Sequence, residues 1–138
     1  MTTSKQQAEN EGFTYLAGAY RSKQGWIGVD ANINVARFWA KQLADANIPM
    51  FCPHLNSAHA EDWSTANENY WLRMDLTILV HAKAIFMLPN YQLSRGAMEE
   101  LKRANEWGIP DFYAQAPTGC KGLAELVTWW KGASIAVH

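Results

Sequence analysis

The sequence is poor in cysteine and has no excess of basic residues, and each shortage excludes a class of protein. Two of its 138 residues are cysteine, and Cys52 and Cys120 form neither a C-x-x-C motif nor a disulfide framework. Lys and Arg number 12 against 13 for Asp and Glu, so the formal net charge is −1. A chain without a basic excess lacks the electrostatic footprint for a nucleic-acid backbone, so no nucleic-acid partner is expected.

Long hydrophobic runs are also missing. The longest apolar stretch, residues 76–89, is interrupted by His81 and Lys83 and is shorter than the roughly 20 residues of a membrane-spanning helix. The first dozen residues are polar and lack the apolar segment of a signal peptide. These features predict a cytoplasmic protein with no membrane partner.

Several motifs of cofactor and hydrolase chemistry are absent. No G-x-G-x-x-G sequence marks a dinucleotide site, and no G-x-S-x-G sequence marks the nucleophile of a serine hydrolase. His54 and His59 do not have a recognised zinc spacing, and no cysteine cluster accompanies them. We therefore expect neither a cofactor nor a metal.

The sequence does contain an alternation of short apolar runs and helical patterns. With 49% hydrophobic residues, the chain is expected to form one domain over residues 12–138, after a disordered segment at residues 1–11. Strands are expected at residues 13–19, 48–53, 83–88 and 109–113. Helices are expected at residues 31–46, about 65–81, 94–107 and 123–131, the first capped by Asp30 and the second by Ser64 or Thr65.

This order predicts an α/β fold, a single-domain Rossmann-like (flavodoxin-like) parallel sheet flanked by helices, because parallel strands need crossover helices. The carboxyl ends of all strands then meet at one edge of the sheet, where such folds bind ligands. Residues 18–21, His54 and residues 89–96 would gather there. The polar loop at residues 54–65 is long enough to be a functional loop.

Two acidic residues fall where helices are expected to approach that edge. In the helix at 94–107, Glu99 projects away from the apolar stripe and can pair with Arg103, whereas Glu100 lies on the flank of the stripe. In the preceding helix, Asp75 lies in the middle of the apolar side, where a charge must be paired or hydrogen-bonded. One interpretation is that Glu100 lies on the surface and that Asp75 ties a loop together. The other is that both carboxyl groups face a ligand cavity.

The start of the helix at residue 94 has the features of an anion site. Ser94 is a natural N-cap, and Gly96 would let a substrate approach the backbone closely. A helix N-terminus of this kind favours an anion such as phosphate. Taken alone, these two residues are explained more simply by a capped helix.

Five segments, in this order, resemble the nucleoside 2-deoxyribosyltransferase-like family, which includes nucleoside deoxyribosyltransferases and 2′-deoxynucleoside 5′-monophosphate N-glycosidases. The segments are YLAGAYRS (15–22), FCPH (51–54), WLRMDLTIL (71–79), AIFMLPN (84–90) and SRGAMEELKRA (94–104). The most specific part is the pattern S-x-G-x-x-x-E, which runs from Ser94 to Glu100.

The resemblance implies a five-stranded sheet and a homodimer or higher homo-oligomer whose neighbouring subunit completes the site. It implies that Glu100 is the catalytic carboxylate that attacks C1′ of the sugar, and that Asp75 is a catalytic acid that contacts the sugar or assists the departing base. The substrate-binding residues it implies are Tyr15 and Gly18 at the sugar and base, Arg21 and Ser94 at a 5′-phosphate, and His54 in the pocket.

The expected partner is therefore a small nucleoside or nucleotide. The expected reaction is cleavage of the N-glycosidic bond of a (deoxy)nucleoside or its 5′-monophosphate, by hydrolysis or by base exchange. Arg21 and Ser94 favour the monophosphate slightly. The alternative is a catalytically inactive nucleotide-binding or sensing module, and the sequence leaves the base, the sugar and the acceptor open.

Overall fold

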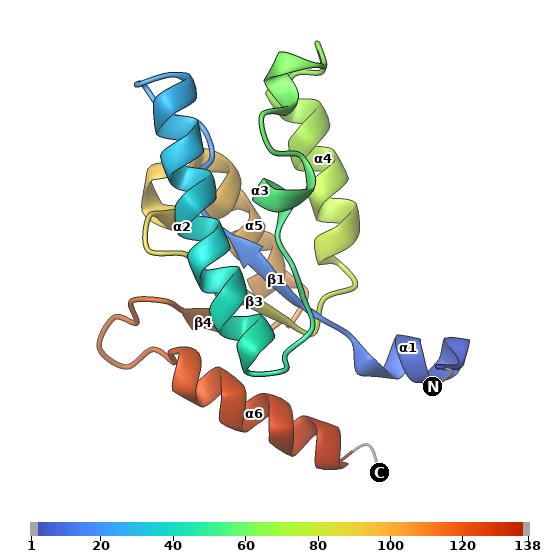
Figure 1. Ribbon diagram of the computed structural model, residues 1–138. Coiled ribbons are helices and arrows are strands. Elements are labelled where there is room, and N and C mark those ends of the chain that lie inside the picture. Colours follow the sequence, from blue (N-terminus) through green and yellow to red (C-terminus); the bar gives the residue numbers. More distant parts are fainter. Residues whose placement is uncertain (1–2, 137–138) are drawn as a thin grey trace.

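The centre of the protein is a four-stranded parallel sheet, seen in a computed structural model that describes residues 3–136 (Figure 1). The expected α/β fold is confirmed. The strands, in the spatial order β2-β1-β3-β4, are β1 (Thr14–Ala17), β2 (Met50–Phe51), β3 (Ala84–Met87) and β4 (Asp111–Tyr113). The longer helices are α2 (Trp26–Asp45), α4 (Glu68–Leu79), α5 (Arg95–Glu106) and α6 (Leu123–Ala136). The shorter ones are α1 (Lys5–Glu11), α3 (Pro53–Asn56), η1 (Ala60–Asp62) and η2 (Tyr91–Leu93).

The helices cover the sheet in two layers because side chains along each strand alternate between its faces. Leu16 and Phe86 belong to a core cluster with α2 and α6. Their neighbours Tyr15 and Ile85 belong to a second cluster with α4 and α5. The residues of β1 and β3 are therefore buried on both faces, and Tyr15 points toward the layer that carries Asp75 and Glu100.

Helix α2 begins earlier than the sequence predicts. It starts at Trp26, after an N-cap at Gly25 with a φ of 67°, so Asp30 lies inside the helix rather than at its cap. A side chain at Gly28 would collide with Ser22, since a Cβ there would lie 1.9 Å from the Ser22 Oγ atom. The two glycines, which suggested a loop through residue 29, instead permit a tight turn directly before the helix.

Helix α4 also has a different start. Asn67 is its N-cap, and the Asn67 side chain accepts a hydrogen bond from the Tyr70 amide at 3.0 Å. Neither Ser64 nor Thr65 caps this helix. Asn67 has a side-chain oxygen that caps in the same way, and it directly precedes Glu68, the first residue of the helix.

The two ends of the chain depart from expectation as well. Residues 5–11, expected to be disordered, form α1 because Ser4 and Gln7 make a reciprocal capping box, although no residue of this helix is buried. Residues 1–2 lie outside the described chain. Within residues 3–136 there is no fifth strand: turns at Pro117 and Gly119 follow β4, and α6 then packs Leu126 onto the sheet. No helix in this range is long and apolar enough to cross a membrane.

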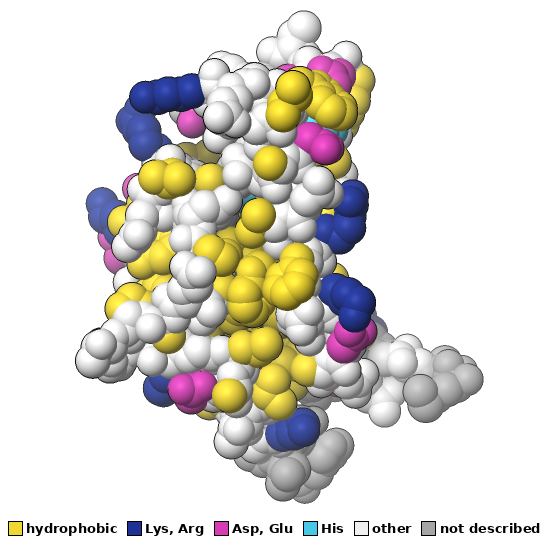
Figure 2. Space-filling model, turned by 60° about the vertical axis from the view of Figure 1, so that its left-hand side comes forward, with side chains coloured by type: hydrophobic (Ala, Val, Ile, Leu, Met, Phe, Trp, Pro, Cys, Tyr) yellow, Lys and Arg dark blue, Asp and Glu magenta, His cyan; other side chains and the backbone are white. Residues whose placement is uncertain are grey.

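One face of the molecule carries many hydrophobic side chains. Figure 2 shows them gathered over the side that α2 and the loop after β3 present. A shallow groove on this side is lined by Val35, Phe38 and Trp39 of α2 and by Pro89 and Leu93. Phe38 and Leu93 are 55% and 85% exposed.

Candidate active site

A cavity of about 300 Å³ opens at the carboxyl edge of the sheet, between the loop after β1, the segment after β2, α4 and the start of α5. In parallel α/β folds, ligands bind at this edge of the sheet, beyond the carboxyl ends of the strands. The cavity brings together the predicted site residues other than Tyr15, namely Gly18, Arg21, His54, Asp75, Ser94, Gly96 and Glu100. Tyr15 is fully buried beneath the floor and reaches the site through Glu100.

Glu100 is a carboxyl group taken almost completely out of water. It is 6% exposed, on the second turn of α5, and its Oε2 atom accepts a hydrogen bond from the Tyr15 hydroxyl. Burial raises the pKa of Glu100 to about 8, with a smaller rise from the charge of Asp75, while the bond from Tyr15 opposes the rise. The neighbouring Glu99 pairs with Arg103 at 3.0 Å, so the prediction that Glu99 projects away from the apolar stripe while Glu100 lies on its flank is confirmed.

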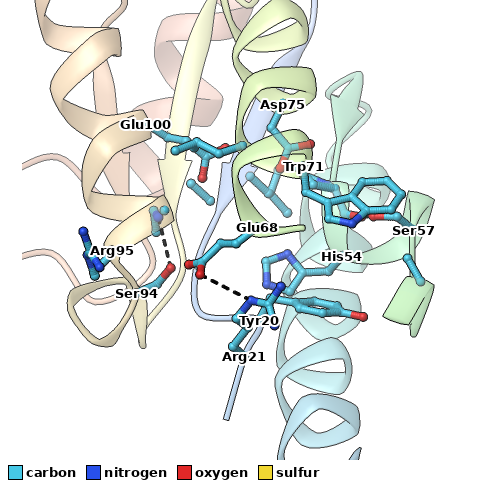
Figure 3. A pocket seen from close by; sticks show the side chains of 18 of the residues that line it. Tyr20, Arg21, His54, Ser57, Glu68, Trp71, Asp75, Ser94, Arg95 and Glu100 are labelled. Atoms are coloured by element: carbon cyan, nitrogen blue, oxygen red, sulfur yellow. Dashed lines mark hydrogen bonds and ion pairs between the residues drawn. The ribbon is translucent and has the colours of Figure 1, made fainter. Parts of the chain in front are cut away.

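Asp75 faces the same cavity from α4 (Figure 3). Burial raises its pKa to about 7. None of the hydrogen bonds in the described chain satisfies its carboxyl group, unlike a structural aspartate that ties a loop together. Two carboxyl groups with raised pKa values therefore share one pocket, an arrangement that concentrates at functional sites.

His54 is buried in the wall of the cavity and is neutral. Burial lowers its pKa, and its Nε2 atom lies 2.8 Å from the carbonyl oxygen of Ala19. Because a carbonyl can only accept, Nε2 carries the proton and donates it to Ala19. His54 therefore fixes the chain after β1 and brings no positive charge to the pocket.

Two asparagines, Asn90 and Asn32, form hydrogen bonds to the backbone of the loop after β1. Asn90 accepts a hydrogen bond from the Ala19 amide at 3.1 Å and donates one to Asn32 at 3.2 Å. Asn32 in turn donates to the Tyr20 carbonyl at 3.0 Å. Gly18 is required by this packing, since a Cβ there would lie 2.7 Å from Leu88 and 2.9 Å from the Asn90 Oδ1 atom.

The mouth of the cavity carries an ion pair. Arg21 Nε lies 3.9 Å from an Oε2 oxygen of Glu68, the first residue of α4, and both side chains are mostly exposed. On the opposite rim, the Ser94 hydroxyl caps α5 by accepting from the Ala97 amide at 3.0 Å. Figure 3 shows the Glu68 side chain lying between Ser94 and Arg21 in this view. Gly96 lines the rim, where a Cβ would meet only the Ser94 hydroxyl, at 3.7 Å.

The outer wall is held by contacts between the loop after β1 and the segment around η1. Tyr20 donates to Glu61 at 2.7 Å, and Trp26 donates to Asp62 at 3.0 Å. The Trp26 ring also stacks on His59, with the ring centroids 4.1 Å apart. Burial and the bond to Glu61 raise the pKa of Tyr20 to about 12, so Tyr20 remains a hydrogen-bond donor at neutral pH.

Within the part of the chain that is described, no group of three His, Cys, Asp or Glu side chains could hold a metal ion. Cys52 lies next to the site but is a buried free thiol, and burial raises its pKa to about 11. Its thiol is therefore a poor nucleophile at neutral pH. The polar groups that line the cavity are carboxyl groups, the Tyr20 phenol, serine hydroxyls, the neutral His54 imidazole and two guanidinium groups.

Sequence patterns missed several residues that shape the cavity. Glu68 lines it from α4, and Glu61 lines it from η1, inside the polar loop at residues 54–65 that was expected to be functional but without a named site residue other than His54. Glu68 looks like an ordinary acid in the first turn of a helix, where it complements the helix dipole. Asn90 follows a proline directly after a strand, which indicates a loop but not its bonds to Ala19 and Asn32.

Comparison with models of known protein families identifies the family of this chain. A family model described as "Domain of unknown function (DUF4406)" matches residues 28–113, more than half of the sequence. The chain belongs to this family. A comparison with curated proteins gives no match. Among solved structures, a 2-deoxyribosyltransferase from the psychrotolerant bacterium Bacillus psychrosaccharolyticus is similar at 22% sequence identity and a TM-score of 0.47, over 75% of this chain and 74% of that one.

Proposed function

We propose that this member of the DUF4406 family cleaves the N-glycosidic bond of a (deoxy)nucleoside or its 5′-monophosphate through Glu100. The observation that carries the proposal is the buried Glu100 carboxyl, which faces the cavity with Tyr15 bonded to it and Asp75 close enough for its charge to act on it. Retaining cleavage of a glycosidic bond needs such a pair, one carboxylate as nucleophile and one carboxylic acid as proton donor.

The chemistry assigns a separate role to each carboxyl group. Ionised Glu100 attacks C1′ of the sugar as the C1′–N bond breaks, and the bonding electrons leave with the base. Protonated Asp75 gives the base a proton or a hydrogen bond as it departs. Water or a second base then attacks C1′ of the glycosyl ester, the ester bond breaks, and Glu100 leaves as a carboxylate. Where Asp75 gave up its proton in the first step, it takes one back from the attacking water or base.

The raised pKa values decide how often the reactive form of the pair is populated. Near neutral pH, burial keeps one proton on the pair, mostly on Glu100, because the pKa of Glu100 is about 8 and that of Asp75 is about 7. Ionised Glu100 beside protonated Asp75 is therefore the minor form, and the hydrogen bond from Tyr15 favours it by stabilising the charged state of Glu100. Trp71 and Tyr20 line the cavity and offer aromatic faces for a base.

The proposal is tested by incubating the protein with a panel of ribo- and deoxynucleosides and their 5′-monophosphates, with and without a second base, and measuring free base by chromatography. We expect base release that is lost in Glu100→Gln and retained in Glu99→Gln, which alters the adjacent carboxylate outside the cavity. Tight binding with no release by the unmodified protein would instead indicate a nucleotide-binding or sensing module.

We also propose that copies of the chain associate, as the resemblance implies. The groove lined by Val35, Phe38 and Leu93 is a candidate contact, because contiguous exposed apolar surface of this kind is typical of interaction sites. A neighbouring subunit would then lie beside the loop after β3 that leads into the active site (Figure 2).

A further inference from the structure

We infer that Glu68 is a specificity determinant of the cavity and makes an uncharged nucleoside, rather than its 5′-monophosphate, the preferred ligand. The inference rests on the proposed function and decides between the two substrate classes that it leaves open. It follows from the position of Glu68 beside the cation that a phosphate group would need.

The charges around the cavity disfavour an added anion. Four carboxyl groups line it, Glu61, Glu68, Asp75 and Glu100, against two guanidinium groups, Arg21 and Arg95. Because Asp75 and Glu100 hold one proton between them near neutral pH, about three negative charges face two positive ones. His54 adds no charge, since its proton is shared with the Ala19 carbonyl and burial keeps it neutral. A phosphate would therefore have to bind through the two arginines and the start of α5.

Arg21 is already engaged by a carboxylate. Glu68 is the first residue of α4, and its Oε2 oxygen lies 3.9 Å from Arg21 Nε. The Glu68 side chain extends from the rim toward the space between Arg21 and Ser94 in Figure 3. A carboxylate in this place offsets part of the positive charge of Arg21 and repels a second anion that approaches it, whereas a neutral 5′-hydroxyl meets no such repulsion.

The neighbouring carboxylate provides a matched comparison. Glu61 also lines the cavity, but it accepts a hydrogen bond from Tyr20 at 2.7 Å and has no contact with Arg21. Replacing either glutamate with glutamine removes one negative charge from the same rim. Only the change at Glu68 frees Arg21.

The experiment measures binding rather than turnover. In a Glu100→Gln background, which prevents consumption of the ligand, isothermal titration calorimetry gives Kd for the four common 2′-deoxynucleosides and their 5′-monophosphates. We expect the parent to bind the nucleoside more tightly. Glu68→Gln should lower the ratio of Kd for the monophosphate to Kd for the nucleoside by about fivefold, the order set by two charges about 4 Å apart in water, because both side chains of the ion pair are mostly exposed. Glu61→Gln should lower the ratio less than about twofold, as expected for a charge farther from the phosphate.

Salt supplies a second readout. Repulsion between exposed charges weakens as the Debye length falls from about 30 Å at 0.01 M to about 8 Å at 0.15 M salt. The ratio should therefore fall with salt more steeply in the parent than in Glu68→Gln. A ratio unchanged by Glu68→Gln, or lowered equally by Glu61→Gln, would overturn this inference and leave the proposed function standing. Failure of every protein to bind either class of ligand would overturn both.

Discussion

The hydroxyl group of Tyr15 in β1 donates a hydrogen bond to the carboxyl group of Glu100 in α5, 85 residues away along the chain. Tyr15 is fully buried, and its own pKa is raised, first by burial and then by the charge of Glu100, so it stays protonated and can donate to Glu100. The contact links the central strand to the helix that forms the cavity wall. It also sets how readily Glu100 becomes a carboxylate.

Removing this hydrogen bond should make Glu100 harder to ionise. In Tyr15→Phe, the pKa of Glu100 should move above its value of about 8, because the lost bond favoured the charged form. Because the reactive form needs ionised Glu100 and protonated Asp75, the profile of rate against pH is a bell. Its alkaline limb should move upward by about one unit, and the rate at pH 7 should fall roughly tenfold. Rates measured from pH 5 to 9 test this. Tyr113→Phe is the matched control, since the Tyr113 hydroxyl bonds Asp111 and lies outside the cavity lining; an equal shift in both variants would contradict the prediction.

Loss of the acid should depend on the leaving group. Asp75→Asn cannot donate a proton to the departing base, so the release of adenine or cytosine should fall by about 10²–10⁴-fold. A 7-methylpurine 2′-deoxynucleoside loses its base as a neutral molecule without protonation, and its cleavage should fall far less. Chromatographic rates for both substrates give the comparison. Equal losses for the two substrates would show that Asp75 does not act as the acid.

The position of the site could be predicted from the sequence because it follows from the order of the elements. Strands that alternate with helices place their carboxyl ends at one edge, so residues after β1 and β3 had to meet there. Helical phase separated Glu99 from Glu100 correctly, since an apolar stripe fixes which side of α5 is buried. These are properties of local periodicity, which the sequence carries directly.

The details around the site depend on contacts between distant segments, and no local pattern reports them. The hydrogen bonds of Tyr20 to Glu61 and of Asn90 to Ala19 join segments that are brought together only in the folded structure. The start of α2 was missed for a related reason: Gly28 is compatible with both a loop and a helix, and its packing on Ser22 decides between them. The fold could therefore be predicted to the level of layers, whereas the caps and the cavity rim could not.

Association of the chain can be tested independently of activity. A homo-oligomer should elute with a mass that is a multiple of 15.5 kDa in light scattering coupled to size exclusion. Phe38→Glu places a charge in the exposed apolar groove and should reduce the mass toward that of one chain. Ile27→Glu, at a 75% exposed position outside that groove, is the control. A single-chain mass at micromolar concentration for the unmodified protein would exclude the oligomer under those conditions.

The asparagine pair should stiffen the cavity wall. In Asn90→Ala, the buried amide of Ala19 loses its acceptor, which should cost about 1–3 kcal/mol of unfolding free energy. Amide exchange at residues 18–21 should become faster than elsewhere in the sheet. Asn34→Ala removes an asparagine of α2 that bonds only Arg37 at the surface and should leave exchange unchanged. Equal protection of residues 18–21 in both variants would show that Asn90 does not hold the wall.

Stability should depend on pH through Glu100. Burial raises the pKa of Glu100 from its ordinary 4.5 to about 8, so the folded state keeps a proton that the unfolded chain releases above about pH 4.5. The contribution of this proton to the free energy of unfolding is complete below about pH 4.5. Above that pH it falls by up to about 1.4 kcal/mol per pH unit, and it is lost once the pH passes about 8. Urea unfolding between pH 4.5 and 9 should show a shallower decline in Glu100→Gln than in the unmodified protein, because glutamine keeps the shape of the protonated acid without titrating. In Glu99→Gln, which removes the partly exposed partner of Arg103, the decline should keep its full slope. If the slopes of the unmodified protein and Glu100→Gln coincided, the carboxyl group of Glu100 would already be ionised at low pH and could not share a proton with Asp75.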